Sequence, residues 1–298
     1  MSTSARTSRP VYLNGRIVPA AEAALPVDDP ATLHGFGFFE TFRTSGGKPH
    51  HWDFNRARLA RSCQIAQLAL PLHFLAHDSS RLREVVSQLL ALHGATDGVF
   101  RYTVTGAPAE LLSFRPLPPP APSDGIALRV LNLPRDSGEW IPRPKSCSYF
   151  NALLGARELQ KRAVDPSDEG LYLSREPSSF ADTQPTRFVV ETPRQNVAWI
   201  EDGQLRFPDF ALGALDGTCL AWVRQLGIPA ASARATFEQL IKAEAVLVLN
   251  SVRGITPVRT IWDTADRLAA GPLASSLHPL LVSLRRQWIE ALAATARS

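Results

Sequence analysis

Residues 143–149 read Arg-Pro-Lys-Ser-Cys-Ser-Tyr, and a run with the apolar spacing of a helix follows them. This stretch places one lysine, Lys145, between a proline-rich approach and a predicted helix over residues 149–163. A lysine amine is a nucleophile that can hold a carbonyl compound covalently. Lys145 is therefore the first candidate for covalent chemistry in this chain.

The composition is that of a globular protein of enzyme size. The 298 residues are 45% hydrophobic and 20% charged, which suits one large or two ordinary domains. The net charge of +4 comes from scattered arginines, so the charge pattern does not predict nucleic-acid binding. The three cysteines have neither the spacing of a disulfide framework nor that of a zinc site, so we expect a reducing compartment and no metal.

The sequence also argues against a membrane or secreted protein. No apolar run approaches the ~20 residues that a membrane-spanning helix needs. Residues 1–10 are rich in serine and arginine, and they lack the apolar core of a signal peptide. We therefore expect a cytoplasmic protein with a disordered N-terminal tail over residues 1–10.

The N-terminal half predicts an α+β domain. Residues 11–18 predict a tight hairpin, and alternating apolar residues predict strands at 38–43 and 99–104. Helical spacing follows at 53–68 and 79–93. The proline-rich stretch that comes next can join neither a helix nor an inner strand, so it marks a domain boundary.

The domains predicted from this boundary are an N-terminal α+β domain, residues 11–120, and a C-terminal, lysine-bearing domain, residues 121–298. In the second domain, apolar runs and turn signals predict a further set of elements. The predicted strands are 126–133, 170–173, 187–190 and 245–249, with a hairpin at 199–207; the predicted helices are 149–163, 218–226, 237–242 and 280–294.

Several motifs occur together and in a fixed order. They are a glycine-aromatic strand at 34–43, Arg-Leu-x-x-Ser at 58–62, Lys-Ser-x-Ser-Tyr at 145–149, Leu-Asp-Gly at 215–217, and Asn-Ser-x-x-Gly-Ile-Thr-Pro-Val at 250–258. As a set they resemble the class IV, or fold-type IV, pyridoxal-phosphate enzymes: branched-chain and D-amino-acid aminotransferases and aminodeoxychorismate lyase. The resemblance implies an α+β fold with a smaller N-terminal α/β domain and a larger C-terminal pseudo-barrel domain. It also implies a homodimer.

The resemblance further implies roles for residues at matching positions. Lys145 would hold pyridoxal 5′-phosphate as a Schiff base and carry the proton between substrate and cofactor. Tyr149 would form a hydrogen bond to the phenolic oxygen of the cofactor ring. The strands that line the substrate pocket in the family carry Phe39, Arg43 and Arg101 here.

The cofactor phosphate requires a guanidinium group and backbone or hydroxyl donors. Arg58 matches the family's arginine for this role. The donors implied by the resemblance lie at the start of a predicted helix and at the end of a predicted strand, and they are Gly217, Thr218, Asn250 and Ser251.

The chain departs from the family pattern at the carboxylate that faces the pyridine nitrogen. In the family, a glutamate there is followed by small residues, an asparagine and a strand, and it keeps the ring nitrogen protonated. Counted without gaps between residues 169 and 188, the glutamate position falls on Ala181 and the asparagine position on Thr186. Asp182 follows Ala181 directly and becomes the candidate for the carboxylate that faces the pyridine nitrogen. Asn55 is a smaller departure, since the family has histidine at this position.

Three functions are compatible with these residues. The first is an aminotransferase that moves an amino group between an α-amino acid and a 2-oxo acid, and the pair Lys145 and Tyr149 favours it. The second is a lyase resembling aminodeoxychorismate lyase. The third is a family member with an impaired cofactor site that acts as a binding protein. We expect the first, with small-molecule partners in amino-acid metabolism and neither nucleic acid nor membrane as a partner.

Overall fold

The computed structural model describes residues 9–68, 74, 79–107, 109–135, 142–162, 165–174 and 186–298. Its contacts divide the chain into two compact units. Unit 1 comprises Met1–Pro119, Pro144–Tyr149 and Ile289–Ser298, and unit 2 comprises Pro120–Arg143 and Phe150–Trp288. Two segments of the predicted C-terminal domain, Pro144–Tyr149 and Ile289–Ser298, thus belong to unit 1.

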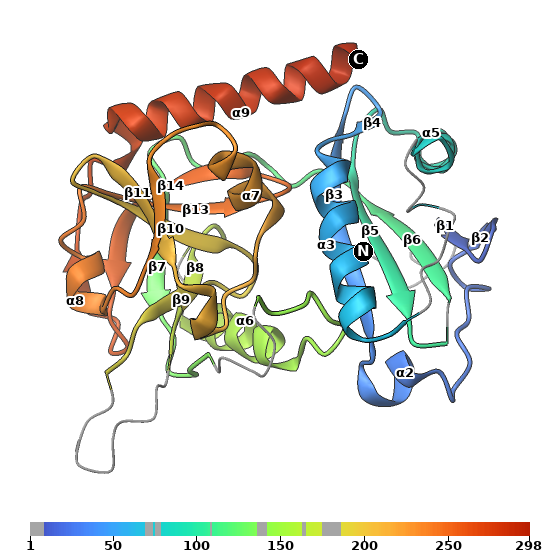
Figure 1. Ribbon diagram of the computed structural model, residues 1–298, viewed down its shortest axis with the longest axis horizontal. Helices are drawn as coiled ribbons and strands as arrows, with labels where there is room; N and C mark the ends of the chain where they lie inside the picture. The colour runs from blue at the N-terminus through green and yellow to red at the C-terminus, as the bar shows by residue number, and fades with distance from the viewer. Residues whose placement is uncertain are drawn as a thin grey trace. The chain divides into compact units, whose positions relative to one another are not determined.

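Unit 1 is built on a six-stranded antiparallel sheet with the order β2-β1-β6-β5-β3-β4 (Figure 1). Its strands are β1 Pro10–Leu13, β2 Arg16–Pro19, β3 Gly37–Ser45, β4 Lys48–Pro49, β5 Val99–Thr105 and β6 Glu110–Arg115. Its helices include α2 Pro30–His34, α3 Trp52–Ile65 and α5 Ser80–Leu92. The predicted hairpin at 11–18, both predicted strands and both predicted helices are confirmed to within a few residues.

The two faces of β3 have different neighbours, because successive side chains of a strand point to opposite sides. Phe38 and Phe42 belong to the same core cluster as Trp52 and Leu59 of α3. The Phe42 ring lies 5.1 Å from the Trp52 ring, centroid to centroid. Phe39 is on the other face and is not a member of that cluster. Helix α3 therefore covers one face of β3 and leaves the face of Phe39 to a different partner.

Unit 2 contains a nine-stranded sheet in which six strands close on themselves. The order is β12-β11-β10-β13-β14-β7-β8-β9, with β15 on β14, and β9 also pairs with β10. The strands are β7 Ile126–Val130, β8 Glu169–Leu173, β9 Val189–Glu191, β10 Asn196–Glu201, β11 Gln204–Pro208, β12 Ala230–Ala233, β13 Ala245–Asn250, β14 Gly254–Trp262 and β15 Leu268–Ala270. This barrel-like sheet, with helices beside it, confirms the predicted α+β fold and its pseudo-barrel.

Four helical segments of unit 2, α6, α7, α8 and α9, agree with the predicted helices to within a few residues, and two short 3-10 helices, η1 and η2, were not predicted. They are α6 Phe150–Arg162, η1 Phe210–Leu212, α7 Thr218–Arg224, α8 Phe237–Leu240, η2 Ser275–Leu277 and α9 Pro279–Arg297, which continues into unit 1. Strands β12, β14 and β15 were not predicted. In β14 a proline lies within an apolar run, and proline argues against an inner strand. The structure places Pro257 opposite Leu247 of β13.

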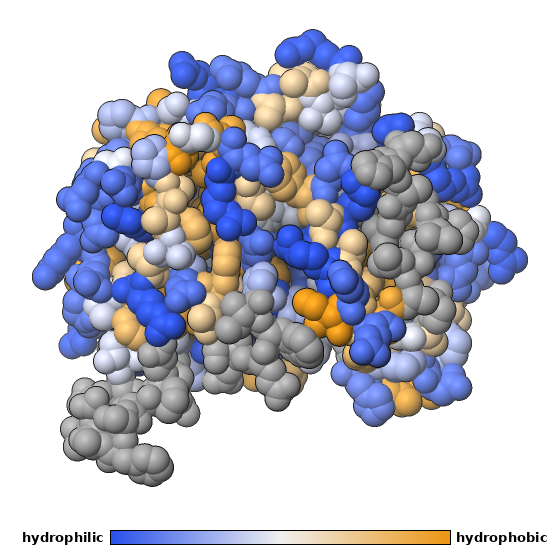
Figure 2. Space-filling view, viewed as in Figure 1, coloured by the Kyte–Doolittle hydropathy of each residue, from blue (hydrophilic) through white to orange (hydrophobic). Residues whose placement is uncertain are grey.

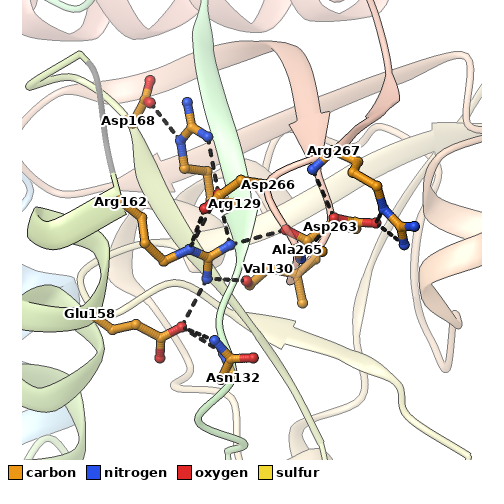
Figure 3. A network of polar contacts seen from close by, with 10 residues as sticks. All are labelled: Arg129, Val130, Asn132, Glu158, Arg162, Asp168, Asp263, Ala265, Asp266 and Arg267. Atoms are coloured by element: carbon orange, nitrogen blue, oxygen red, sulfur yellow. Dashed lines mark hydrogen bonds and ion pairs between the residues drawn. The ribbon is translucent and has the colours of Figure 1, made fainter.

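Helix α6 is joined to the sheet of unit 2 by a polar network centred on Arg162 (Figure 3). Arg162 donates from Nη1 to the carbonyl of Val130 and to Glu158, both at 2.8 Å, and from Nη2 to Asp266 at 2.9 Å. Glu158 also accepts the backbone N–H of Asn132 at 2.8 Å. The network holds the helix that follows the lysine segment against β7 and against the turn between β14 and β15.

Hydrophilic side chains cover much of the face seen in Figure 2, with apolar ones scattered among them. None of the helices in the described part of the chain combines the length and the apolar character that crossing a membrane requires.

Candidate functional site

In unit 1, the segment that carries Lys145 pairs with the beginning of β3. The backbone N–H of Phe39 donates to the carbonyl of Lys145 at 3.0 Å, and the N–H of Cys147 donates to the carbonyl of Gly37 at 2.8 Å. Gly35 has φ +68°, and a Cβ at this position would lie 3.1 Å from the backbone of Ser148. Gly35 therefore allows the lysine segment to approach the residues before β3 closely.

The Lys145 amine lies among aromatic rings. Its Nζ is 4.6 Å from the centroid of the Phe39 ring and 5.6 Å from that of the Tyr149 ring. These two rings meet edge to face with centroids 5.3 Å apart. The Arg101 guanidinium carbon lies 3.6 Å from the centroid of the Phe39 ring. Four predicted site residues, Lys145, Tyr149, Phe39 and Arg101, thus form one cluster.

Arg43 lies four residues after Phe39 on β3, near the end of the strand that leads into the turn before β4. Burial lowers its pKa, and the nearby Asp97 opposes this change. It also contributes to lowering the pKa of His50, for which burial and His51 are the larger causes. The Arg43 Nε donates to the carbonyl of Thr44 at 3.3 Å, at this end of β3.

Arg58 lies on α3, where it is 6% exposed, and it forms a buried ion pair with Glu40 of β3. Its Nε donates to Oε1 of Glu40 at 2.8 Å and its Nη2 donates to Oε2 at 2.5 Å. Asn55, one turn earlier on α3, donates from Nδ2 to the same Oε2 at 2.7 Å. The asparagine that replaces the family's histidine is therefore part of this ion pair's surroundings.

Cys147 is a second nucleophile in the lysine segment. Burial raises the pKa of its thiol, and Arg101 opposes this in part. Burial also raises the pKa of Cys63 to about 11. A raised pKa keeps a thiol protonated and unreactive at neutral pH. The raised pKa values of these thiols favour Lys145 over Cys147 and Cys63 as the reactive group.

Among the described residues, no group of His, Cys, Asp and Glu side chains could hold a metal ion.

In unit 2, Gly217 and Thr218 lie where α7 begins. Gly217 has an extended backbone, with φ −71°, and a Cβ there would overlap the side-chain oxygen of Asn196. Asn196 donates from Nδ2 to the carbonyl of Leu215 at 2.7 Å. Glycine is therefore required at position 217 by close packing rather than by its dihedral angles. Thr218 is 5% exposed.

Asn250 and Ser251 lie at the end of β13. The Asn250 side-chain oxygen accepts the N–H groups of Val252 at 2.9 Å and of Arg253 at 2.7 Å. Its Nδ2 donates to Gln195 at 2.9 Å. Asn250 thus shapes the turn that contains Ser251.

Glu191 is a buried carboxylate of unit 2. The count without gaps between residues 169 and 188, which placed the family's glutamate at Ala181, did not find it. Glu191 is 4% exposed and ends strand β9. Its Oε1 forms an ion pair with the Arg135 guanidinium at 2.7 Å and accepts a hydrogen bond from the Arg143 guanidinium at 2.8 Å. Its Oε2 accepts the backbone N–H of Leu215 at 2.9 Å. Two guanidinium groups and one N–H therefore surround this carboxylate.

Glu191 and Asn196 reproduce the family's order of a glutamate, an asparagine and a strand. They stand five positions apart, as do positions 181 and 186, and Asn196 opens β10. Glu191 and Asn196 also face each other where β9 pairs with β10. A count anchored on the Asp-Gly turn of the following hairpin would have found this pair. Asp182 lies outside the described residues.

Comparison with known proteins shows one family to which this chain is similar. The family model of the amino-transferase class IV matches residues 37–261. The aminodeoxychorismate lyase of Bacillus subtilis is 26% identical over 292 residues, which cover 91% of this chain and 92% of that protein.

Solved structures share the fold. A branched-chain aminotransferase from Thermoproteus uzoniensis, in complex with norvaline, superposes with a TM-score of 0.74 at 22% identity over 96% of this chain and 95% of that one. The 4-amino-4-deoxychorismate lyase from Pseudomonas aeruginosa gives a TM-score of 0.72 at 24% identity over 94% of this chain and 98% of that one.

Proposed function

Since the chain belongs to the amino-transferase class IV family, we propose that it is a pyridoxal-phosphate-dependent aminotransferase in which Lys145 carries the cofactor. The observation that carries the proposal is the cluster of Lys145, Phe39, Tyr149 and Arg101 in unit 1. It places an amine, a phenol and a guanidinium around one aromatic ring.

The residues present fit pyridoxal phosphate by their chemistry. The cofactor's aldehyde requires an amine, its phenolic oxygen a hydrogen-bond donor, its ring nitrogen a carboxylate and its phosphate a guanidinium group. Lys145, Tyr149, Glu191 and Arg58 are the residues that we propose for these four groups. When bound, the cofactor supplies an electron sink that stabilises negative charge at the substrate's α-carbon.

Lys145 has two roles in this proposal. It binds the cofactor covalently and, once the substrate amine has replaced it, takes the proton from the substrate's α-carbon. The rings of Phe39 and Tyr149 lie beside its amine and exclude water from that side. The hydrogen bonds between the lysine segment and β3 fix the backbone from which the amine acts.

Glu191, rather than Asp182, is our candidate for the carboxylate at the ring nitrogen. It is buried, it is held by Arg135, Arg143 and a backbone N–H, and it has the family's spacing to Asn196. A carboxylate at this place holds a proton on the ring nitrogen.

Other predicted site residues would bind the substrate and the cofactor phosphate. The Arg101 guanidinium, stacked on Phe39, is suited to a substrate carboxylate, and therefore to an amino acid and a 2-oxo acid. The proposed ligands of the phosphate, with Arg58 as the charged one, are Arg58, Gly217, Thr218, Asn250 and Ser251.

A lyase is the second candidate, and the similarity to the Bacillus subtilis aminodeoxychorismate lyase favours it. The two activities differ in their products. An aminotransferase forms a 2-oxo acid from an amino acid only when an amino acceptor is present. A lyase of this kind releases pyruvate from aminodeoxychorismate with no acceptor added.

The test begins with the visible absorption of the purified chain mixed with pyridoxal phosphate. We expect a new band that Lys145→Ala abolishes and that Lys161→Ala, at an exposed lysine of α6, preserves. Failure of the parent chain to form the band would reject the aminotransferase and lyase proposals and favour the third hypothesis, a family member with an impaired cofactor site. A band that persists in Lys145→Ala would reject the role of Lys145. Product assays with and without a 2-oxo acid acceptor then separate aminotransferase from lyase.

A further inference from the structure

Glu40 is a buried carboxylate that the proposed mechanism does not use. It lies in the middle of β3, on the face that α3 covers, and it is 1% exposed. Removing a carboxylate from water costs free energy unless charged partners and hydrogen bonds compensate it. Its described partners are Arg58 and Asn55, both on α3. One of these partners, Arg58, is the charged residue among the proposed phosphate ligands.

The geometry of the pair constrains the arginine more than a single hydrogen bond would. Arg58 donates to Glu40 from both Nε and Nη2, at 2.8 and 2.5 Å, so one edge of the planar guanidinium is matched to both carboxylate oxygens. A bidentate contact of this kind fixes the plane and the direction of the group. Because the other donors of the guanidinium are rigidly attached, their directions are fixed as well.

Asn55 constrains the carboxylate in turn. Its Nδ2 donates to Oε2 of Glu40 at 2.7 Å and to the carbonyl of Thr41 at 3.2 Å. It is fully buried, with 0% of its surface exposed. Asn55 is thus anchored to β3 through the Thr41 carbonyl and gives the Glu40 carboxylate a second contact on α3 that does not depend on the Arg58 side chain.

We propose that Glu40 is a positioning residue for the cofactor phosphate: it orients the Arg58 guanidinium through the bidentate contact. This inference rests on the proposed function, since it requires that Arg58 binds the phosphate. The pair has no formal net charge, so the contribution of Arg58 to phosphate binding lies in the direction of its donors rather than in its net charge. A buried ion pair adds little stability compared with apolar residues. The proposed function of the Glu40–Arg58 pair is therefore to orient the Arg58 guanidinium.

The experiment compares pyridoxal phosphate with pyridoxal, which lacks the phosphate, by titrating each into the purified chain and following the visible band. Glu40→Gln keeps the shape of the side chain and removes the charge. We expect the affinity for pyridoxal phosphate to fall about tenfold or more, which is the size of one lost hydrogen bond to a charged group. The affinity for pyridoxal is expected to stay within about twofold.

A double variant tests whether Glu40 acts through Arg58. In the Arg58→Met background, Glu40→Gln is expected to change the affinity for pyridoxal phosphate no further, because the group it orients is gone. An additive effect would overturn the inference. If Glu40→Gln alone does not fold, as judged by circular dichroism, Asn55→Leu replaces it. That variant keeps both charges and should show a smaller loss that is again confined to pyridoxal phosphate.

Asp168→Asn is the matched control, because Asp168 is also a buried carboxylate, 3% exposed, and pairs with the buried Arg129 at 2.9 Å. It should leave the ratio of the two affinities unchanged. Equal losses of pyridoxal and pyridoxal phosphate in Glu40→Gln, or no loss, would overturn the inference while the parent chain still binds the cofactor. If the parent chain binds neither compound, it is the proposed function that fails.

Discussion

At the level of single residues, the candidate site depends on carboxylates whose surroundings differ. Glu191 is buried, forms an ion pair with Arg135, and accepts hydrogen bonds from Arg143 and the N–H of Leu215. Glu40 is buried and faces Arg58. The first is proposed to hold a proton on the cofactor ring, and the second to orient a phosphate ligand. Both roles require that the negative charge stays in place after burial.

Glu191→Gln tests the assignment of the ring-nitrogen carboxylate. An amide cannot hold a proton on the ring nitrogen as a carboxylate does, so we expect turnover to fall at least about 100-fold. The affinity for pyridoxal phosphate should change much less, because the lysine and the phosphate ligands remain. Steady-state kinetics and cofactor titration measure the two effects. Asp182→Asn is the comparison, and a large loss there with none in Glu191→Gln would return the role to Asp182.

A second prediction concerns the histidines at the far end of β3. Burial lowers the pKa of His50 to about 3, with His51 and Arg43 as smaller causes, and burial lowers that of His51 to about 4. In the unfolded chain both are protonated below about pH 6.5. The unfolded state therefore binds more protons at acidic pH, and stability falls as the pH drops below about 6.5. The slope is up to about 1.4 kcal/mol per pH unit for each histidine.

Urea unfolding at about pH 7 and about pH 5 measures this loss of stability. His50→Gln stays neutral at both values, and we expect it to lose less stability between them than the parent chain. His34→Gln, at an exposed histidine, should lose as much as the parent. A His50→Gln variant with the parent's pH dependence would contradict the prediction.

At the level of elements, the lysine segment depends on what lies on each side of it. Before Lys145, Arg143 donates to Glu191 and to the carbonyl of Gly213 at 3.1 Å. After it, α6 is held by Arg162, whose side chain is 13% exposed. These contacts set the positions of both flanking segments within unit 2.

Arg162→Ala is therefore expected to destabilise unit 2. The substitution removes donors from the carbonyl of Val130 and from the carboxylates of Glu158 and Asp266, and we expect a loss of about 2 kcal/mol in the free energy of unfolding. Chemical denaturation provides the measurement. Arg267→Ala, at a side chain that is 80% exposed and pairs with Asp263, is the control and should change stability little. Equal effects of the two substitutions would show that the network contributes no more than a surface ion pair.

At the level of the whole molecule, the family resemblance implies a homodimer. Helix α6 carries two large apolar side chains one turn apart that are well exposed, Phe150 at 71% and Leu153 at 57%. Apolar side chains that lie together on a surface are typical of contact sites between proteins. We predict that light scattering after size exclusion gives a mass near twice 32.6 kDa. A mass near the single value at micromolar concentration would contradict a stable dimer.

The sequence by itself determined those features that depend on neighbouring residues. The alternation at 38–43, the Asp-Gly turn at 202–203 and the lysine motif at 145–149 act through local backbone preferences and a fixed motif order. The local patterns predicted most elements, and the resemblance carried by the motif order implied the α+β fold and named Lys145, Tyr149 and Phe39 as site residues.

Only the tertiary structure decided which distant residues meet. It paired residues 145–147 with β3, joined β9 to β10 at Glu191 and Asn196, and gave Arg58 its partner Glu40. Pairing between strands, and between a strand and a helix, depends on packing over long separations, which no local periodicity records. For the same reason, the ungapped count placed the family's glutamate at Ala181, ten positions before Glu191.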